Sequence, residues 1–209
     1  MATIPEHLIP SRLAKRANFD KETLHQILDA VLYCTVSYAV DNKPFSIPTA
    51  FARYGDKLYI HGSVGSHFIR ELEKGLPVCI SVTLIDALVV AKSAFHHSMN
   101  YRSAVIFAQA EKVEDLAQKA DALEWIVDKM VPGSWHYLRP MKENEVRKTT
   151  VLAFSLDEAS AKLRSGMPID DDEDMQLPIW SGLIPLETKR GTPVADESST
   201  RIELPGHLG

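Results

Sequence analysis

Polar side chains that could bind an anion gather in residues 95–106, directly before an apolar run. They are Ser98, Asn100, Tyr101, Arg102 and Ser103. An arginine offers a planar fork of donors that matches phosphate oxygens, and nearby hydroxyl groups add donors that can converge on the same group. The segment therefore predicts an anion site anchored on a strand over residues 104–108. The alternative is a polar loop in which Arg102 pairs with a surface carboxylate.

A second segment, residues 58–70, has the order strand, glycine turn and helix start. Its polar members are His61, Gly62, Ser63, Ser66, His67 and Arg70. Unpaired backbone N–H groups at a helix start, together with the helix dipole, attract phosphate. Two such segments in one small domain favour a phosphorylated ligand. The sequence has neither the glycine-rich loops of Rossmann and P-loop proteins nor the G-x-S-x-G elbow of esterases, so a nucleotide must be bound by another kind of fold.

The composition is that of an ordinary globular protein. Of 209 residues, 45% are hydrophobic and 24% are charged, which suits one well-filled core. A net charge of −5 argues against a protein whose main task is to bind DNA or RNA. No apolar run reaches the roughly 20 residues that cross a membrane. The N-terminus also lacks the apolar core of a signal peptide, so we expect a cytoplasmic protein.

The cysteines and histidines do not favour a metal site. Cys34 and Cys79 lie inside apolar, strand-like runs, where buried reduced thiols are favoured over a disulfide. Four histidines flank the two polar segments, but none has the spacing of a zinc site. These histidines are His61, His67, His96 and His97. We therefore predict no bound metal ion.

The regular patterns predict a mainly β, α+β domain. Helical spacing marks residues 20–30, and a longer helix is expected over residues 116–130. Most of the remaining runs are typical of antiparallel strands. The expected strands are 31–40, 44–54, 57–61, 77–84, 87–93, one after Asn100 and one over 150–156, with a turn at Ile85 and Asp86 and a short helix near 68–75. A sheet that curls into a small barrel accounts for this order.

The composition changes after residue 157. An acidic run over residues 170–174 is typical of a solvated loop. Trp180 lies in a proline-bounded apolar patch, so we expect it to pack against this chain or a partner. Residues 188–209 have the composition of a flexible tail, which leaves a single domain over residues 1–187.

Five blocks of the sequence resemble the flavin-nucleotide-binding branch of the pyridoxamine 5′-phosphate oxidase-like proteins, which includes the nitroimidazole-resistance proteins. The blocks are residues 47–51, 58–62, 82–89, 95–103 and 180–186, so the likeness runs in order over about residues 12–187. The resemblance implies an antiparallel six-stranded split β-barrel that binds FMN, with a few peripheral helices. It also implies a homodimer with two flavin sites at the subunit interface.

The resemblance further implies which residues contact FMN. Pro48, Thr49, Ala50 and Phe51 would pass beside the isoalloxazine ring, Thr83 would approach the flavin edge, and the segment around Trp180 would complete the site. The phosphate end would be held by the two polar segments, that is by His61, Gly62, Ser63, Ser66, His67, Arg70, Ser98, Asn100, Tyr101, Arg102 and Ser103. Many relatives carry Lys or Arg directly after the turn serine, where this chain has His67. Part of the positive charge must therefore come from Arg70 or Arg102.

We expect an FMN-dependent oxidoreductase that moves electrons between NADH or NADPH and a small oxidised substrate. His61 could donate a proton, because its pKa lies within reach of neutral pH, or it could simply hydrogen-bond beside the flavin. A module that stores or senses FMN without turnover is a second interpretation. A haem-binding split barrel with His96 or His97 as iron ligand is a third. Pyridoxamine phosphate oxidation itself is disfavoured, because we find no arginine–histidine pair near the C-terminus where that enzyme reads its substrate.

Overall fold

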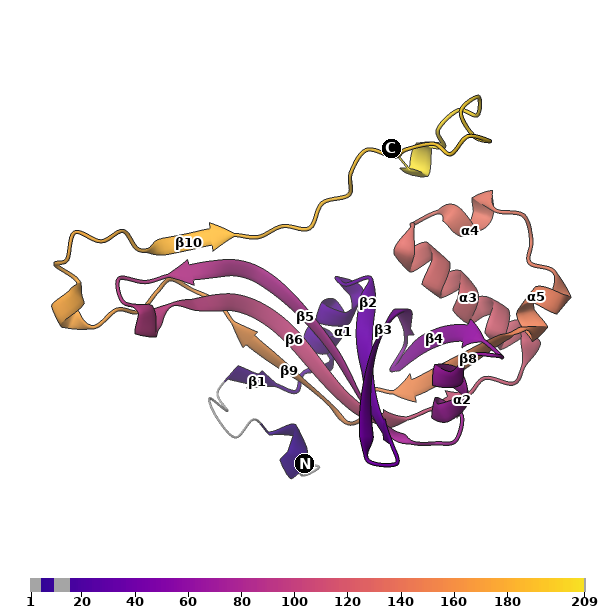
Figure 1. Cartoon of the computed structure of the whole chain (residues 1–209), viewed down its shortest axis with the longest axis horizontal. Helices are drawn as coiled ribbons and strands as arrows, with labels where there is room; N and C mark the ends of the chain where they lie inside the picture. The colour runs from indigo at the N-terminus through magenta and orange to yellow at the C-terminus, as the bar shows by residue number, and fades with distance from the viewer. Residues whose placement is uncertain (1–4, 10–15, 209) are drawn as a thin grey trace.

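The computed structural model describes residues 5–9 and 16–208, which form one antiparallel sheet with helices around it (Figure 1). The strands are β1 (Ala17–Asn18), β2 (Tyr33–Val40), β3 (Lys43–Tyr54), β4 (Lys57–Ser63), β5 (Pro77–Val90), β6 (Ser98–Gln109), β7 (Glu111–Lys112), β8 (Thr149–Ser155), β9 (Ala159–Arg164) and β10 (Gly182–Pro185). The helices are α1 (Lys21–Asp29), α2 (His67–Leu72), α3 (Leu116–Met130), α4 (Ser134–Tyr137) and α5 (Glu143–Arg147). Short 3-10 turns are η1 (Glu6–Leu8), η3 (Ala94–His96), η4 (Asp172–Asp174) and η5 (Gly206–Leu208).

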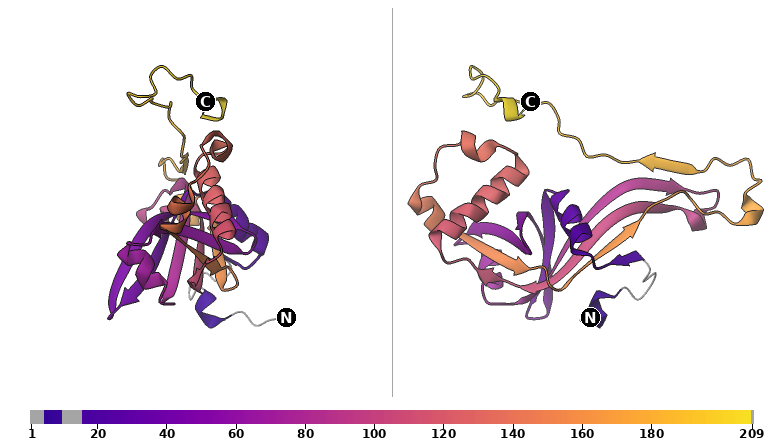
Figure 2. Two further views of the ribbon diagram at one scale, coloured as in Figure 1. Left: turned by 90° about the vertical axis from the view of Figure 1, so that its right-hand side faces the viewer. Right: turned by 180° about the vertical axis from the view of Figure 1, so that it is seen from behind.

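The strand order in the sheet is β1-β9-β6-β5-β2-β3-β4-β8-β7, and β10 pairs with β5. The sheet curls without closing, which confirms the expected mainly β split barrel, but the described residues form more strands than the expected six. β5 and β6 run beyond the barrel as a long ribbon with β10 alongside β5 (Figures 1 and 2). We call residues 86–100 together with residues 180–185, which include β10, the arm.

Helix α1 packs its apolar side against the inner face of the curled sheet. Asp20 caps the helix by accepting a 2.8 Å hydrogen bond from the backbone N–H of Thr23, as expected from the sequence. Leu24, Ile27 and Leu28 are buried in the core. The burial of this apolar side, more than helix propensity, holds so short a helix in place.

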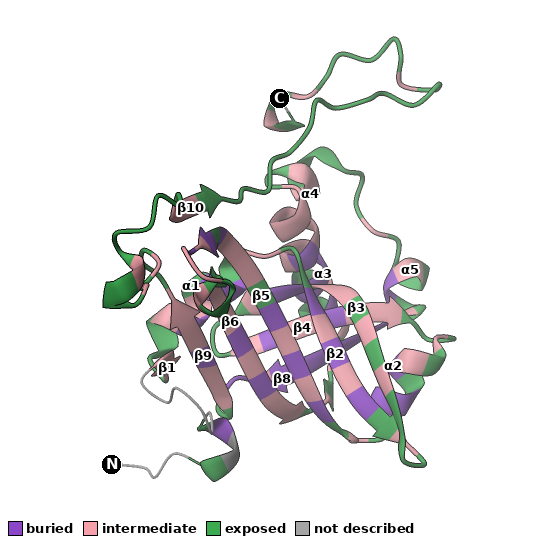
Figure 3. Ribbon diagram, turned by 60° about the vertical axis from the view of Figure 1, so that its left-hand side comes forward, coloured by how far each residue is buried: buried purple, intermediate pink, exposed green. Residues whose placement is uncertain are grey.

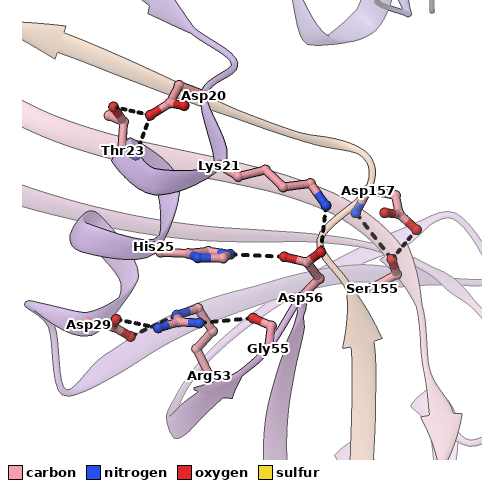
Figure 4. A network of polar contacts seen from close by, with 10 residues as sticks. All are labelled: Asp20, Lys21, Thr23, His25, Asp29, Arg53, Gly55, Asp56, Ser155 and Asp157. Carbon is pink, nitrogen blue, oxygen red and sulfur yellow. Dashed lines mark hydrogen bonds and ion pairs between the residues drawn. The ribbon is translucent and has the colours of Figure 1, made fainter.

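Polar pairs tie α1 to the turn between β3 and β4 (Figure 4). Arg53 donates to both carboxylate oxygens of Asp29, at 3.0 and 2.6 Å, and to the carbonyl oxygen of Gly55. Asp56 in turn lies 3.2 Å from Nε2 of His25. These groups are partly exposed, so each pair contributes little alone, and together they fix the direction of the helix.

The strands alternate between the core and the outer face of the sheet. In β2, Cys34, Val36 and Tyr38 point into the core, so the residues between them point outward. Both cysteines are free thiols, as predicted. Burial raises the pKa of Cys34 to about 12 and also raises the pKa of the half-buried Cys79. Both therefore stay protonated at neutral pH.

The expected turn at Ile85 and Asp86 is wrong, because β5 is one strand from Pro77 to Val90. The pairing with β6 continues on both sides of Asp86, with a bulge between Ile85 and Ala87. Aspartate is rare inside strands, which made this position look like a turn. Here the bulge holds the extra residue, and Arg102 on β6 pairs with its carboxylate.

Other differences concern the C-terminal half. β6 begins at Ser98, before the expected start after Asn100, so the polar residues 98–103 all lie in the strand. β9 and the short helices α4 and α5 were not predicted. The C-terminal residues are mostly exposed, but Arg190 donates to the carbonyl oxygen of Met130 at 2.6 Å, and the ring of His207 lies 5.3 Å from that of Tyr137. None of the described helices is long and apolar enough to cross a membrane.

Helix α3 covers only part of the outer face. The ring of Trp125 stacks on Tyr54 with 4.0 Å between centroids and meets the edge of Tyr59 at 5.2 Å, so the end of β3 and the adjoining β4 are covered. Figure 3 is turned so that β5, β2 and β3 face the viewer, with no helix in front of them. We call the outer face of β5, β2 and the first half of β3 the open face.

Candidate functional site

The open face is built of small side chains in register. Thr35 pairs with Pro48 on one side and with Ser81 on the other, and Ser81 pairs with Val105. Residues paired directly across antiparallel strands point to the same face, so these four form one row across β3, β2, β5 and β6. Such a row offers a flat surface with hydroxyl groups.

A second row lies two residues further along the strands and contains several of the expected site residues. Tyr33 pairs with Ala50, and Thr83 pairs with Ser103. Carrying the β3–β4 register one position beyond Phe51↔Ile60 places His61 opposite Ala50. Carrying the β2–β5 register on in the same way places Tyr33 opposite Thr83. The fold therefore brings expected residues from four strands to one face.

Two hollows mark the open face. A cavity of about 150 Å³ is lined by Val31, Tyr33, Thr35, Ser81, Val82 and Thr83. A larger one of about 580 Å³ lies toward the β2–β3 turn and is lined by Ser37, Tyr38, Ala39, Pro44, Phe45, Ser46, Pro77, Val78, Cys79 and Phe107. Together they give a planar ligand both an apolar surface and hydroxyl partners.

Strand alternation separates the expected residues of β3. Pro48 and Ala50 belong to the open face, whereas Phe51 is fully buried in the core and Thr49 points to the same inner side. Thr49 and Phe51 thus lie behind the surface that a planar ligand would touch. Their contribution is to the packing beneath it.

His61 lies on β4 where the open face meets the part covered by α3. Its side chain is half-buried, and Nδ1 is buried without a hydrogen-bond partner in the part of the chain that the structure describes. Burial lowers the pKa of His61 below its usual 6.5, so the imidazole is neutral at pH 7. A buried polar atom without a partner is costly, and it suits a position where a ligand supplies that partner.

The glycine and the serines at the turn after β4 have structural roles. A Cβ on Gly62 would lie 2.5 Å from Cγ1 of Ile69, so only glycine lets α2 pack so closely. Ser66 caps α2 through the N–H of Ile69, and the Ser63 hydroxyl accepts from Gly65 at 3.2 Å. Arg70 is exposed and makes no hydrogen bond or ion pair with the described residues, which leaves its guanidinium available to an anion.

The residues of the β6 segment do not converge on one group within the chain. Because the segment is strand, Tyr101 and Ser103 point to the outer face, and Asn100 and Arg102 to the inner side. Nε of Arg102 lies 3.0 Å from Oδ2 of Asp86, and Nη2 lies 2.7 Å from Oδ1. The pairing of Arg102 with a carboxylate, considered above as the alternative, is thus what the structure shows.

Asn100 and Ser98 have local surroundings of their own. Asn100 is buried, donates to the carbonyl oxygen of Gly166 at 3.0 Å and accepts from Arg164. It therefore holds the segment after β9 against the arm. Ser98 is exposed at the start of β6, and His67 is exposed on α2 with Nδ1 3.6 Å from Glu71.

Trp180 and two histidines lie on the arm. Trp180 remains 64% exposed in the single chain, so its expected burial partner is not within the described residues. Its indole ring lies against Gly182, where a Cβ would be 2.8 Å from Cζ2. Nδ1 of His97 is 2.9 Å from the carbonyl oxygen of Ser93, and Nε2 of His96 is 3.2 Å from Asp171.

Sequence reasoning missed the residues of β2 and β5 that build the open face. Tyr33, Thr35 and Ser81 line it, yet none was singled out. The signal was present, because β2 alternates polar residues with Cys34 and Val36. Such alternation identifies an outward face but not whether another element covers it.

Comparisons with known proteins agree with this fold. The family model described as pyridoxamine 5′-phosphate oxidase matches residues 20–163. The flavocytochrome Anf3 from Azotobacter vinelandii is 36% identical, with 98% of this chain and 95% of that chain covered and a TM-score of 0.90. The FAD and heme binding protein from Mycobacterium smegmatis is also 36% identical, with 92% and 95% covered and a TM-score of 0.88.

A putative 5-nitroimidazole antibiotic resistance protein from Bacteroides thetaiotaomicron is 25% identical, with 70% of this chain and 85% of that chain covered and a TM-score of 0.57. No curated protein matches the chain. Because the family model matches well over half of the sequence, the chain belongs to the pyridoxamine 5′-phosphate oxidase family.

Proposed function

We propose that this chain is a flavin-dependent oxidoreductase that also binds haem, with the flavin lying on the open face. The observation that carries the proposal is the pair of rows across β3, β2 and β5, whose side chains are small except for Tyr33, beside Nδ1 of His61, which has no hydrogen-bond partner among the described residues. Similarity supports the choice of cofactors. A flavocytochrome and an FAD and heme binding protein share 36% identity with this chain over nearly its whole length.

The open face fits a flavin ring in shape and chemistry. Isoalloxazine is planar, apolar on its faces and polar at its edges, so it needs a flat surface with donors at the rim. Thr83 supplies a hydroxyl group along one row, and the small Pro48 and Ala50 keep the surface flat there. The hydroxyl of Ser103 already donates to the carbonyl oxygen of Lys162 at 3.2 Å, so towards a flavin it can only accept. When bound, the flavin would supply hydride acceptance from NADH or NADPH and one-electron transfer onward. The protein would hold the ring and limit access of water.

The flavin is bound through the parts that FMN and FAD share. FMN is the cofactor that the family resemblance implies, whereas one 36%-identical structure is described with FAD. The ring and the first phosphate are common to both. Arg70 is an exposed cation near the β4–α2 turn that makes no hydrogen bond or ion pair with the described residues, and we assign the first phosphate to it.

Haem also finds suitable groups in this chain. It requires a histidine nitrogen free to bind iron and an apolar surface for the porphyrin. The arm carries His97 among large exposed side chains that include Phe95 and Trp180, at 88% and 64% exposure. A soluble chain rarely leaves such side chains uncovered without a ligand or partner.

We further propose that the protein works as a homodimer with the open face in the interface. Tyr33 on the open face is 64% exposed, and the arm projects with apolar side chains on its surface. A second subunit packed on this face would cover both and would enclose the flavin between subunits.

The visible spectrum of the purified full-length protein tests the proposal. We expect flavin bands together with a Soret band, and bleaching of the flavin bands by NADH or NADPH under anaerobic conditions. Release of the flavin by heat and chromatography separates FMN from FAD. Ser81→Phe, which fills the middle of the row, should lose flavin, whereas Ala117→Phe on the exposed side of α3 should keep it. Equal flavin content in both variants would show that the open face does not bind the flavin.

A further inference from the structure

We propose that His97 binds the haem iron through Nε2 and that the porphyrin lies on the outer face of the arm. The inference rests on the proposed function, because it assumes that the chain takes up haem. It assigns the iron to one of the two adjacent histidines at the tip of the arm.

The hydrogen bond of His97 decides which ring nitrogen is free. Nδ1 lies 2.9 Å from the carbonyl oxygen of Ser93, and a carbonyl oxygen can only accept. The proton of a neutral His97 therefore sits on Nδ1, and Nε2 carries the lone pair. Nε2 has no partner among the described residues, and the side chain is exposed. A backbone carbonyl that holds one ring nitrogen while the other binds metal is the usual arrangement of histidine ligands.

The neighbouring His96 is less accessible. Its Nε2 is buried and has no hydrogen-bond partner among the described residues, with a carboxylate oxygen of Asp171 3.2 Å away, and its ring meets the ring of Phe95 edge to face at 5.1 Å. Iron at this nitrogen would have to displace Asp171 and open the packing of the loop. The ring of His96 thus faces into the loop, and His97 presents its free nitrogen outward.

An apolar surface for the porphyrin lies beside His97. Leu88 pairs with Met99 on β6 and with Ile184 on β10, so the three side chains form one row across three strands. All three are between 40% and 47% exposed. With about 4.8 Å between neighbouring strands, the row spans about 10 Å.

Trp180 extends the same surface toward His97. Gly182 stands two residues before Ile184, so its missing side chain would point to the face of the apolar row, and the indole ring of Trp180 occupies that place. Gly182 pairs with Val90, and the β5–β6 register carried one step beyond Val89↔Ser98 puts His97 opposite Val90. An indole plane, an apolar row and an oriented imidazole thus meet at the end of the arm.

Hemin titrated into the purified full-length protein tests the assignment. We expect His97→Ala to weaken hemin binding by at least about 100-fold. Loss of a residue that only supports a metal ligand lowers affinity by up to about 100-fold, and loss of the ligand itself should cost at least as much. Added imidazole should restore the ferric Soret position in His97→Ala. His96→Ala is the matched control, and it should keep the wild-type spectrum. Flavin content and thermal unfolding should not change in His97→Ala, because the side chain is exposed.

The outcomes separate the two levels of the proposal. A wild-type protein that shows no Soret shift with hemin would overturn haem binding itself. Wild-type binding with an unchanged spectrum in His97→Ala would overturn the His97 assignment and leave the proposed function standing. Loss of binding in His96→Ala but not in His97→Ala would also overturn it. Loss in His97→Ala with rescue by imidazole supports the site.

Discussion

The ammonium group of Lys129, in the last turn of α3, donates a 2.6 Å hydrogen bond to the carbonyl oxygen of Leu28 at the end of α1. It also lies 3.5 Å from the centroid of the Phe51 ring. A cation at a helix C-terminus satisfies a free carbonyl and interacts well with the helix dipole. Lys129 therefore joins the helix on the outer face to the helix in the core.

Lys129 should make stability depend on pH in alkaline solution. Burial lowers its pKa from 10.5 to about 8, although the nearby Asp29 opposes the shift. Between these values the unfolded chain binds more protons than the folded one, so the free energy of unfolding rises with pH. We expect wild type to gain about 1–2 kcal/mol relative to Lys129→Met from pH 7.5 to 10, allowing for partial exposure. Urea unfolding of both proteins measures this, and a pH-independent difference would contradict it.

Arg70 and Arg102 should differ in their effects on flavin binding. Arg70 has no partner among the described residues, whereas Arg102 already pairs with Asp86. A charge-assisted bond to phosphate contributes about 1.5–3 kcal/mol. We expect Arg70→Ala to weaken FMN by that amount and to leave riboflavin unchanged. Arg102→Ala should act equally on both ligands, as should Asp86→Asn, its matched control. Titration of both ligands into each variant tests this expectation. A selective loss of FMN binding in Arg102→Ala would show that Arg102, and not Arg70, binds the phosphate.

His61→Gln should separate the two half-reactions of turnover. The variant keeps much of the bulk and one hydrogen bond, so flavin content should stay the same. If His61 protonates the substrate, reoxidation of the reduced flavin should slow on the order of 100-fold, while reduction by nicotinamide changes far less. Stopped-flow kinetics from pH 5 to 8 would show the wild-type rate falling above the lowered pKa of His61. His67→Gln, on the exposed surface of α2, is the control. Equal rates in both variants would make His61 a packing residue.

Removing β10 should disrupt the dimer and the flavin site together. A chain that ends at Met175 keeps β9 but loses Trp180 and uncovers the edge of β5 that β10 pairs with. We expect this chain to be monomeric and poor in flavin, because stable homodimers bury about 2,000 Å² or more in total. A chain that ends at Glu187 retains β10 and is the control. Sedimentation measures the oligomeric state of both chains, and visible absorbance measures their flavin content. A monomer without β10 that still binds flavin fully would contradict the prediction.

Much of the fold could be predicted because its elements are strongly patterned. The α1 helix has both a cap and periodic apolar residues, and α3 begins and ends within a residue of the expected 116–130. The bulge at Asp86 could not be predicted, because the aspartate is accommodated there by its partner Arg102, which lies 16 residues away in the sequence. β9 is a short strand of six residues with no long apolar run, so its pairing with β6 was not predicted.

The candidate site was harder to predict than the fold. The resemblance selected positions such as Ala50 and Thr83, and the register places these two on one face. Arg102 and Ser103 were expected to converge on one phosphate group. Adjacent residues of a strand point to opposite sides, so the state of the backbone at residue 102 determined whether the donors could converge.

The contact between Trp180 and Gly182 has a consequence for how this family can vary. Any side chain at position 182 would need the space of the indole, since even a Cβ would lie 2.8 Å from Cζ2 and 3.0 Å from Cη2. The two positions should therefore change together among homologous sequences. Where evolution has placed a larger residue at position 182, position 180 should no longer be tryptophan, and the surface of the arm beside it should have a different shape and a different ligand.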